Sequence, residues 1–286
     1  MAISAKQLSS RRVRQIVAQT RRAEATIGRR YRNELRRFFI GQAKRVVKIW
    51  LDAGGYLTSA SDGEYKDAAS QLIGATENDA IIAATRKYAL EMTVVSLNQA
   101  EELSVAVTGT AAGGQILANN PMALYLAAQS AQRVVLVNDA TRRAIARTIV
   151  KGMSEGFSAY EIARGSTRTD AHKFRPLDKI VGPPYLYRNR PDCIARTELA
   201  FSNNGAALHR YDAAGMAMVE VSDGPDCGWE YHDDPDKANR TLRTIQASNQ
   251  FQIAHPNCVR VFMPSHMRTR RRREGPAAPI ETFITR

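Results

Sequence analysis

The stretch SSRRVRQIVAQTRRAEATIGRRYRNELRRFFIGQAKRVVKIWLDAGG (9–55) decides the fold of this chain. Its apolar and small side chains recur mostly at steps of three and four residues, which places them on one stripe of an α-helix. Ser9 or Ser10 can cap the start, and the two glycines 54–55 can end it. The sequence predicts one helix of up to about 44 residues, roughly 65 Å long, with Gly28 and Gly41 as positions where it could bend. The predicted stripe consists of Ile16, Thr20, Ala23, Ile27, Tyr31, Leu35, Phe38, Val46 and Ile49.

A helix this long with a narrow apolar stripe needs something to cover the stripe along its whole length. One possibility is a partner protein or neighbouring copies of the same chain, as in a coiled coil. The other is an antiparallel hairpin with a second long helix, which the apolar spacing predicts at 77–102. Both possibilities are open at the level of sequence.

Further along the chain, the sequence predicts helices at 121–137, 139–153, 158–164 and 192–214. Ser158 followed by Glu161 forms the pattern of a capping box. Strands are predicted at 216–222, 242–245 and 259–263, and the Gly-, Pro- and Arg-rich stretch 165–190 is predicted to be an ordered surface loop. The predicted fold class is mainly α with a small α+β C-terminal module: long N-terminal helices, a helical body, then a helix plus short antiparallel strands.

The charge of the chain is concentrated at its two ends. The chain has 41 Lys or Arg against 28 Asp or Glu, a net charge of +13. Residues 1–50 hold fourteen basic residues against two glutamates, and residues 268–286 hold six against two. The body between them has 21 basic and 24 acidic residues, a net charge of −3.

Basic ends on a slightly acidic body suit contact with a polyanion, because each neutralised phosphate releases counterions whatever the base sequence. A solvated helix face or an acidic protein partner also explains the pattern. The predicted contact residues are Arg11, Arg12, Arg14, Arg21, Arg22, Arg29, Arg30, Arg36, Arg37, Arg270, Arg271, Arg272 and Arg273.

Composition and cysteine usage indicate a globular protein kept in a reducing compartment. Three cysteines cannot form a closed disulfide framework, and the N-terminus lacks the apolar run of a secretory signal. The uncharged stretch 103–132 is interrupted by Gly and Asn-Pro before it is long enough to span a bilayer. No contact with a membrane is expected.

The most specific chemical pattern lies in the last third of the chain. Cys227 and His232 form a Cys-x4-His pair, and after 22 further residues His255 and Cys258 form a His-x-x-Cys pair. Two short ligand pairs joined by a loop are what a tetrahedral structural zinc site needs. Alternatively, the thiols are simply packed in the core, His255 sits in a turn, and Trp229 is a core anchor.

Acidic and basic side chains next to this pattern are predicted to form a network that holds the fold together. Arg196 and Glu198 are two apart on the predicted helix and point to different faces. Glu198 can accept from backbone amides of the turn that begins at Asp223, while Arg196 can meet Asp226 or the acidic residues at 233–236. The predicted network consists of Arg196, Glu198, Asp223, Asp226 and Trp229.

This region resembles the minor capsid, or head morphogenesis, family of tailed bacteriophages that is named for phage Mu protein F. The family pattern is an Arg-Thr-Glu-x(n)-Asn helix, a strand, an Asp-x-x-Cys turn, and a His-Pro-x-Cys before a final strand. The resemblance covers roughly 135–265. The matching residues are Arg196, Thr197, Glu198, Asn203 or Asn204, Asp223, Cys227, Trp229, His232, His255, Pro256 and Cys258. The chain departs from the pattern at Glu230 and Arg260, where many members carry cysteines.

The resemblance implies a structural protein of the virion and not an enzyme. It implies a place inside the capsid at the portal vertex, after assembly in the host cytoplasm, in several copies around the portal. The implied partners are the portal protein, the major capsid protein and packaged DNA. The chain then divides into a basic helix for portal or DNA contact (1–55), a helical body with an uncharged loop near 103–121 (56–134), a Mu F-like module (135–267) and an Arg-rich flexible tail (268–286).

Two other functions fit parts of the sequence. A sequence-independent DNA-binding protein that acts outside a particle would use the same basic ends. A metal-dependent nuclease would use carboxylates and histidines to hold a divalent ion and activate water. The residues available for that chemistry are Glu198, Asp226, His232, Asp233, Asp234 and His255.

Overall fold

A computed structural model describes residues 5–55, 69–109, 111, 113, 116–166, 174–181, 190–223, 241–253 and 258–265, with side chains from residue 11 onward. Helices dominate, and a three-stranded antiparallel sheet lies near the C-terminal end of the sequence. The predicted fold class is confirmed.

Contacts group the chain into two compact units, and neither is one continuous segment. The first unit takes residues 1–29, 86–130 and 193–286, and the second takes 30–85 and 131–192. The long helices α1 (Ala5–Asp52) and α3 (Ala75–Thr108) contribute residues to both units.

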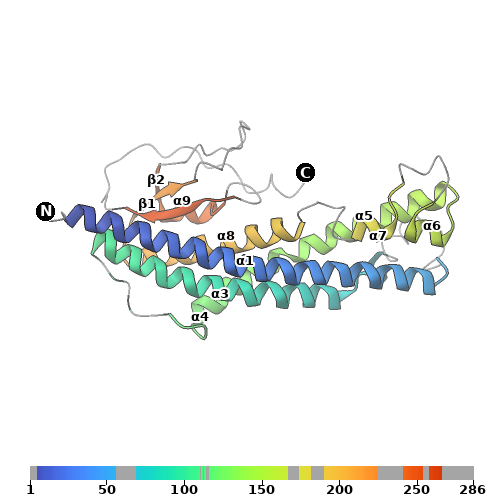
Figure 1. Cartoon of the computed structure of the whole chain (residues 1–286), viewed down its shortest axis with the longest axis horizontal. Coiled ribbons are helices and arrows are strands. Elements are labelled where there is room, and N and C mark those ends of the chain that lie inside the picture. The colour runs from blue at the N-terminus through green and yellow to red at the C-terminus, as the bar shows by residue number, and fades with distance from the viewer. Residues whose placement is uncertain are drawn as a thin grey trace. The chain divides into compact units, whose positions relative to one another are not determined.

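Helices α1 and α3 run antiparallel, side by side (Figure 1). In the first unit the guanidinium of Arg12 pairs with Glu102 at 2.7 Å. In the second unit the hydroxyls of Tyr31 and Thr85 are 2.6 Å apart, and Arg45 donates to Glu77 at 2.6 Å. The hairpin possibility is therefore the one that the structure adopts. Of the two possibilities for covering the stripe, the chain therefore uses its own helices.

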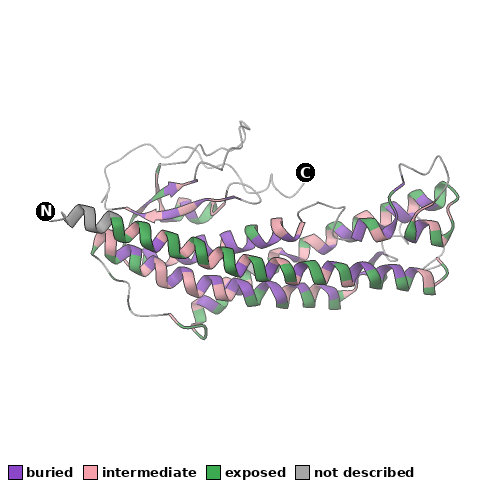
Figure 2. Cartoon of the chain, in the orientation of Figure 1, coloured by how far each residue is buried: buried purple, intermediate pink, exposed green. Residues whose placement is uncertain are grey.

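The buried stripe of α1 follows the predicted spacing up to Leu35 and again at Val46, but it differs by one residue at two positions. Phe39 and Trp50 are buried, whereas Phe38 is only half-buried and Ile49 is 38% exposed. Steps of four from Tyr31 through Leu35 lead to residue 39, so the helical period selects Phe39 for the core. Figure 2 shows the resulting mixture of buried and exposed residues along α1. The helix continues through both glycines, 28 and 41.

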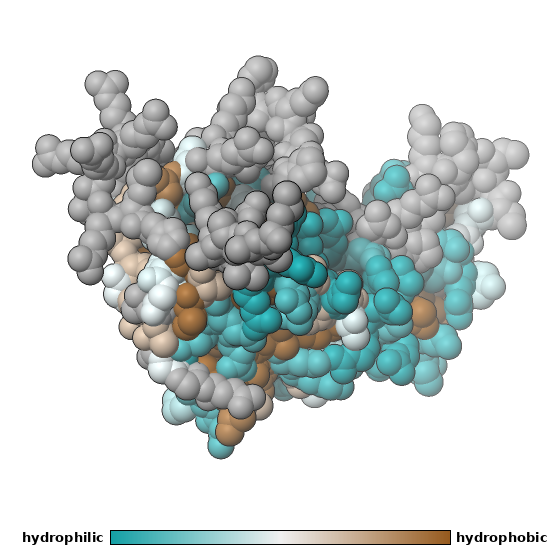
Figure 3. Space-filling view, turned by 60° about the vertical axis from the view of Figure 1, so that its left-hand side comes forward, coloured by the Kyte–Doolittle hydropathy of each residue, from teal (hydrophilic) through white to brown (hydrophobic). Residues whose placement is uncertain are grey.

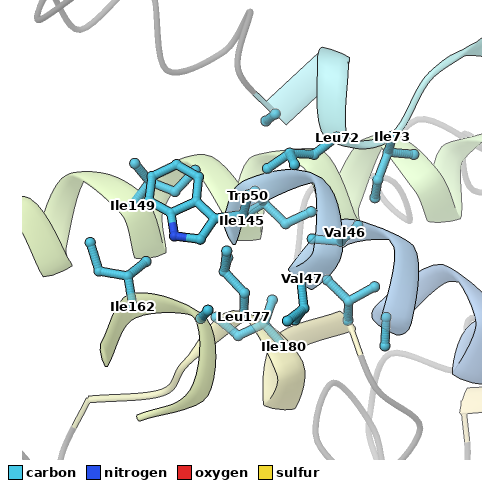
Figure 4. Close-up of a cluster of buried hydrophobic side chains, with 14 of the residues drawn as sticks. Val46, Val47, Trp50, Leu72, Ile73, Ile145, Ile149, Ile162, Leu177 and Ile180 are labelled. Atoms are coloured by element: carbon cyan, nitrogen blue, oxygen red, sulfur yellow. The ribbon is translucent and has the colours of Figure 1, made fainter. Parts of the chain in front are cut away.

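The second unit has its own apolar core around Trp50 (Figure 4). Helices α5 (Val135–Ser154), α6 (Ala159–Arg164) and α7 (Leu177–Val181) surround the end of α1 there. The indole nitrogen of Trp50 donates to the carbonyl of Ala159 at 2.8 Å. The Ser158 capping box that begins α6 is confirmed.

The prediction of a surface loop over 165–190 is wrong in part. Residues 177–181 form α7, and its Leu177, Ile180 and Val181 are buried. These apolar residues at steps of three and four form one helical face, which the glycines and prolines around them obscure in the sequence.

Gly152 of α5 offers a test of how tightly this core is packed. A Cβ at this position would lie 2.5 Å from Cγ1 of Ile162 and 3.1 Å from Cζ of Phe174. Alanine favours a helix by about 1 kcal/mol over glycine, but overpacking a core costs about 1–3 kcal/mol. We expect Gly152→Ala to lower the urea midpoint of unfolding.

Gly41→Ala is the matched control, because a Cβ on Gly41 of α1 would meet only the end of the flexible Arg45 side chain. This substitution should raise the midpoint slightly through helix propensity. If both variants raised the urea midpoint equally, Ile162 and Phe174 would be able to move aside for the new methyl group without a loss of stability.

The first unit carries the sheet. Strand β1 (Met218–Ser222) lies between β2 (Leu242–Thr244) and β3 (Val261–Pro264), both antiparallel to it. Helix α8 (Arg190–Ala213) packs Leu208 and Tyr211 onto the sheet residues Val219 and Phe262. A short helix, α9 (Ile245–Gln250), follows β2 directly. The three strands confirm the predicted ones to within two residues.

Helix α4 (Pro121–Arg133) follows the predicted uncharged loop. Leu117, Leu124 and Tyr125 are all about half exposed, at 60%, 46% and 56%. Figure 3 shows a mostly hydrophilic face with small, separate hydrophobic areas, one of them where the chain leads into α4. No helix in the described part of the chain is long and apolar enough to cross a membrane.

Candidate functional site

Most of the predicted metal site lies outside the described residues. This holds for Cys227, His232 and His255, while Cys258 is a buried free thiol just before β3. Within the described ranges, no three His, Cys, Asp or Glu side chains are grouped so that they could hold a metal ion. The zinc site therefore stays a prediction. Also outside are Asp226, Trp229 and the arginines 270–273 of the C-terminal tail.

A buried ion pair joins the end of β1 to the start of β3. Arg260 donates from Nε to Oδ1 of Asp223 at 2.7 Å and from Nη2 to Oδ2 at 3.1 Å. The two side chains are only 1% and 7% exposed. Arg260 also donates to the carbonyl of Phe251 at 3.3 Å. A bidentate pair of this kind fixes both the position and the orientation of the guanidinium relative to the carboxylate.

No role for Arg260 was predicted from the sequence. Its burial and its pairing with Asp223 place it at the centre of this module. The two flanking valines, Val259 and Val261, predict an outward-facing arginine; what could have indicated its burial is that Arg260 has the same parity as Cys258 and Phe262, which lie on the buried face.

The two candidate asparagines of α8 hold different parts of the module. Nδ2 of Asn204 donates to the carbonyls of Gln252 and Arg260, at 2.6 and 2.9 Å. Oδ1 of Asn203 accepts from the Ser96 hydroxyl of α3 at 2.7 Å. Asn204 therefore links α8 to the residues just after α9 and to those just before β3. Asn203 links α8 to α3.

Arg196 and Glu198 point to different faces of α8, as predicted. Glu198 is 6% exposed, whereas Arg196 is exposed. The turn and acidic run that were predicted to bind them lie outside the described residues, so those contacts stay predictions. A second ion pair, which is part-buried, was not predicted: Arg210 of α8 donates to Glu101 of α3 at 2.9 Å, across 109 residues of sequence.

A cavity of about 290 Å³ opens in the first unit between α1, α3, α8 and β3. Its lining includes Cys258, Arg260 and Arg196, so the cavity lies beside the ion pair described above. Glu24 of α1 also lines it. Burial raises the pKa of the Glu24 carboxyl, and the charges of Arg196 and then Arg21 oppose this rise.

This burial makes Glu24 a source of pH-dependent stability. Its pKa is raised in the folded state above the ordinary 4.5, so folding favours the protonated acid. The stability that this group contributes is present below pH 4.5 and is lost as the pH rises through the folded pKa. We expect Glu24→Gln to be more stable than wild type at neutral pH.

The difference between Glu24→Gln and wild type should shrink as the pH falls towards 4.5, which chemical denaturation at a series of pH values will measure. A loss of stability at neutral pH would show that the attraction to Arg196 and Arg21 outweighs the cost of burial. Glu34→Gln on α1 serves as a control.

The basic face of α1 differs between the two units. In the first unit, Arg11, Arg22 and Arg29 are exposed, and within the described part of the chain they take part in no ion pair. They are separated by eleven and seven residues, about three and about two turns, so they share one side of the helix.

In the second unit the basic residues of α1 are largely paired with acids of the same unit. Arg32 and Arg36 both meet Asp192, at 2.6 and 3.3 Å, and Lys48 pairs with Asp52. The arginine stripe of the first unit, Arg11, Arg22 and Arg29, is therefore the part of α1 best suited to bind an external anion.

No protein-family model, curated protein or solved structure matches this chain.

Proposed function

We propose that this chain is a structural minor capsid protein of the Mu protein F type, which acts in head morphogenesis of a tailed bacteriophage. It is bound inside the head at the portal vertex, in several copies, after assembly in the host cytoplasm. Its partners are the portal protein, the major capsid protein and the packaged DNA. The candidate cofactor is a structural zinc ion.

The observation that carries the proposal is that two residues of the resemblance, Asn204 and Asp223, bind the same residue, Arg260, although the chain departs from the family pattern at that position. Helix α8 with Asn204, strand β1, Asp223, and Cys258 before β3 follow one another in the order of the family pattern. Asn204 donates to the carbonyl of Arg260, and Asp223 binds the guanidinium of the same residue. Residues scattered over about 60 positions of sequence therefore form one buried cluster, as a module with a shared structural role requires.

The arginine stripe of α1 supports contact with an anionic surface. Its guanidinium groups are exposed and are spaced along one side of a helix. Such a surface fits the phosphates of DNA or an acidic patch on a portal subunit.

The same stripe favours a second candidate, a DNA-binding protein without sequence preference that acts outside a particle. The two differ in partner, because only the minor capsid protein requires the portal. The nuclease hypothesis receives no such support. Glu198, the one residue of that hypothesis among the described residues, is buried at 6% exposure.

Co-expression with the portal protein of the same genome, followed by size exclusion and metal analysis, tests the proposal. Deletion of residues 1–55 would be uninformative, because it removes Trp50 and other core residues of α1. The variant to use is Arg11→Gln/Arg22→Gln/Arg29→Gln. The matched control, Arg86→Gln/Arg143→Gln/Arg147→Gln, changes the charge equally at other exposed positions.

A complex with portal that the stripe variant loses and the control keeps would support the minor capsid proposal. Binding to duplex DNA alone, with a log–log salt slope that falls by about 2–3 in the stripe variant, would favour the second candidate. If the chain binds neither the portal protein nor duplex DNA, both proposed functions are rejected.

A further inference from the structure

The cavity of the first unit is bounded by one face of each of three helices and by the segment that contains β3. The lining residues of α3 are at 96, 99, 100 and 103, and those of α1 are at 17, 20, 21 and 24. Residues three and four apart share one face of a helix. Gln99 therefore lies on the same face of α3 as Ala100 and Leu103, and this face lines the cavity.

Small and aromatic side chains give the cavity its shape. Ala100 of α3 and Ala200 and Ala207 of α8 leave the space open, and Tyr211 and Phe262 also line it. A cavity of about 150 Å³ is enough to hold benzene, and this one measures about 290 Å³. Aromatic side chains favour contact with other flat rings. The space therefore suits a planar molecule of two fused rings.

One hydrogen-bond acceptor of the lining has no partner. Oε1 of Gln99 is a buried atom and accepts no hydrogen bond within the described residues. A buried acceptor without a donor is unfavourable, so a ligand that brings an N–H or O–H group to it gains affinity. Three hydroxyl groups of the lining donate elsewhere in the chain: that of Thr20 to the carbonyl of Ile16, that of Ser96 to Asn203, and that of Tyr211 to the carbonyl of Phe262.

The charged side chains of the lining favour an uncharged ligand. Arg21 and Arg196 both attract the carboxylate of Glu24. Arg260 is paired with Asp223. A charged ligand would have to compete with these attractions and would lose its own hydration, whereas a neutral ligand leaves them intact.

We propose that this cavity binds a neutral, planar, bicyclic aromatic molecule, which donates one N–H or O–H group to Oε1 of Gln99. Its rings lie between the alanines of α3 and α8. Indole is the simplest member of this chemical class. The proposal does not depend on the proposed function, because it rests on the lining alone.

Titration calorimetry of the purified full chain with indole tests this proposal. Benzofuran, which has the same two rings with an oxygen in place of the N–H group, is the matched ligand. We expect saturable one-site binding of indole, about fivefold tighter than that of benzofuran, which corresponds to one neutral hydrogen bond. Gln99→Leu should lower the affinity for indole to that for benzofuran and leave benzofuran binding unchanged.

Two further variants locate the binding. Ala200→Leu should abolish binding of both ligands by filling the cavity. Gln19→Leu should change neither affinity, because Gln19 is exposed on α1 and does not line the cavity.

A spectroscopic readout keeps the test sharp if Ala200→Leu does not fold. In the nitrogen–proton NMR spectrum, the side-chain amide signal that disappears in Gln99→Leu should shift when indole is added, and the signal that disappears in Gln19→Leu should not. Non-saturable binding of indole, equal affinity for indole and benzofuran, or a preference for indole that survives Gln99→Leu would overturn the proposal.

Discussion

Replacing Asp223 with alanine will lower the free energy of unfolding by about 3–5 kcal/mol, because it leaves the Arg260 guanidinium buried without its counter-charge. The side chain of Arg260 is 1% exposed and cannot reach water without opening the sheet. Arg260 also donates to the carbonyl of Phe251 at 3.3 Å, and a neutral carbonyl does not replace the charge of the carboxylate. Urea denaturation followed by circular dichroism will measure the loss.

Hydrogen exchange should locate the loss in the first unit, since Asn204 and Arg260 are linked there. Glu220→Ala is the control, because Glu220 lies on the same strand as an exposed acid. The double variant Asp223→Leu/Arg260→Leu should recover most of the stability, since apolar residues often replace a buried pair without cost. A loss under about 1 kcal/mol for Asp223→Ala would mean that Arg260 finds another partner.

Trp50→Ala will lower the free energy of unfolding by about 3–5 kcal/mol, the range for a large aromatic side chain removed from a core. Trp50 is 2% exposed and lies between Ile145, Ile149 and Ile162 in the core of the second unit (Figure 4). The same urea experiment measures the effect, and exchange should rise in α5 and α6.

Trp50→Phe separates packing from hydrogen bonding. Phenylalanine keeps most of the apolar contact but loses the donor to Ala159, which is worth about 1 kcal/mol. Ile49→Ala is the positional control, because Ile49 is 38% exposed and should matter little. If Ile49→Ala lowered the free energy of unfolding as much as Trp50→Ala, the finding that Trp50 is buried in place of the predicted Ile49 would be refuted.

Local patterns in the sequence were enough to predict the long helices, α6 and the three strands, but not the short helices α7 and α9. The capping box at Ser158 and Glu161 marks the start of α6, because its hydrogen bonds involve only neighbouring residues. The helical period of α1 predicts its length and its stripe as far as Leu35. Predictions failed where local signals conflict, as in the glycine- and proline-rich stretch that hides α7.

The candidate site was predictable only in part. The alternation of faces on α8 places Arg196 outside and Glu198 inside, and periodicity alone predicts this. The choice between Asn203 and Asn204 was not predictable, since both are buried and only the contacts distinguish them. The partner of Asp223 was not predictable from the metal-ligand pattern, because that partner is the guanidinium of Arg260, 37 residues further along the chain.

The sequence by itself determined the helices, the short strands, the basic ends and the apolar stripe of α1, because each depends on residues within a few turns of one another. Only the tertiary structure decided what covers that stripe, which acid meets Arg260 or Arg210, and where three alanines leave a cavity. These features depend on residues 37 to 109 positions apart, such as Asp223 with Arg260 and Glu101 with Arg210. No local period encodes such contacts, since packing of the complete chain selects them.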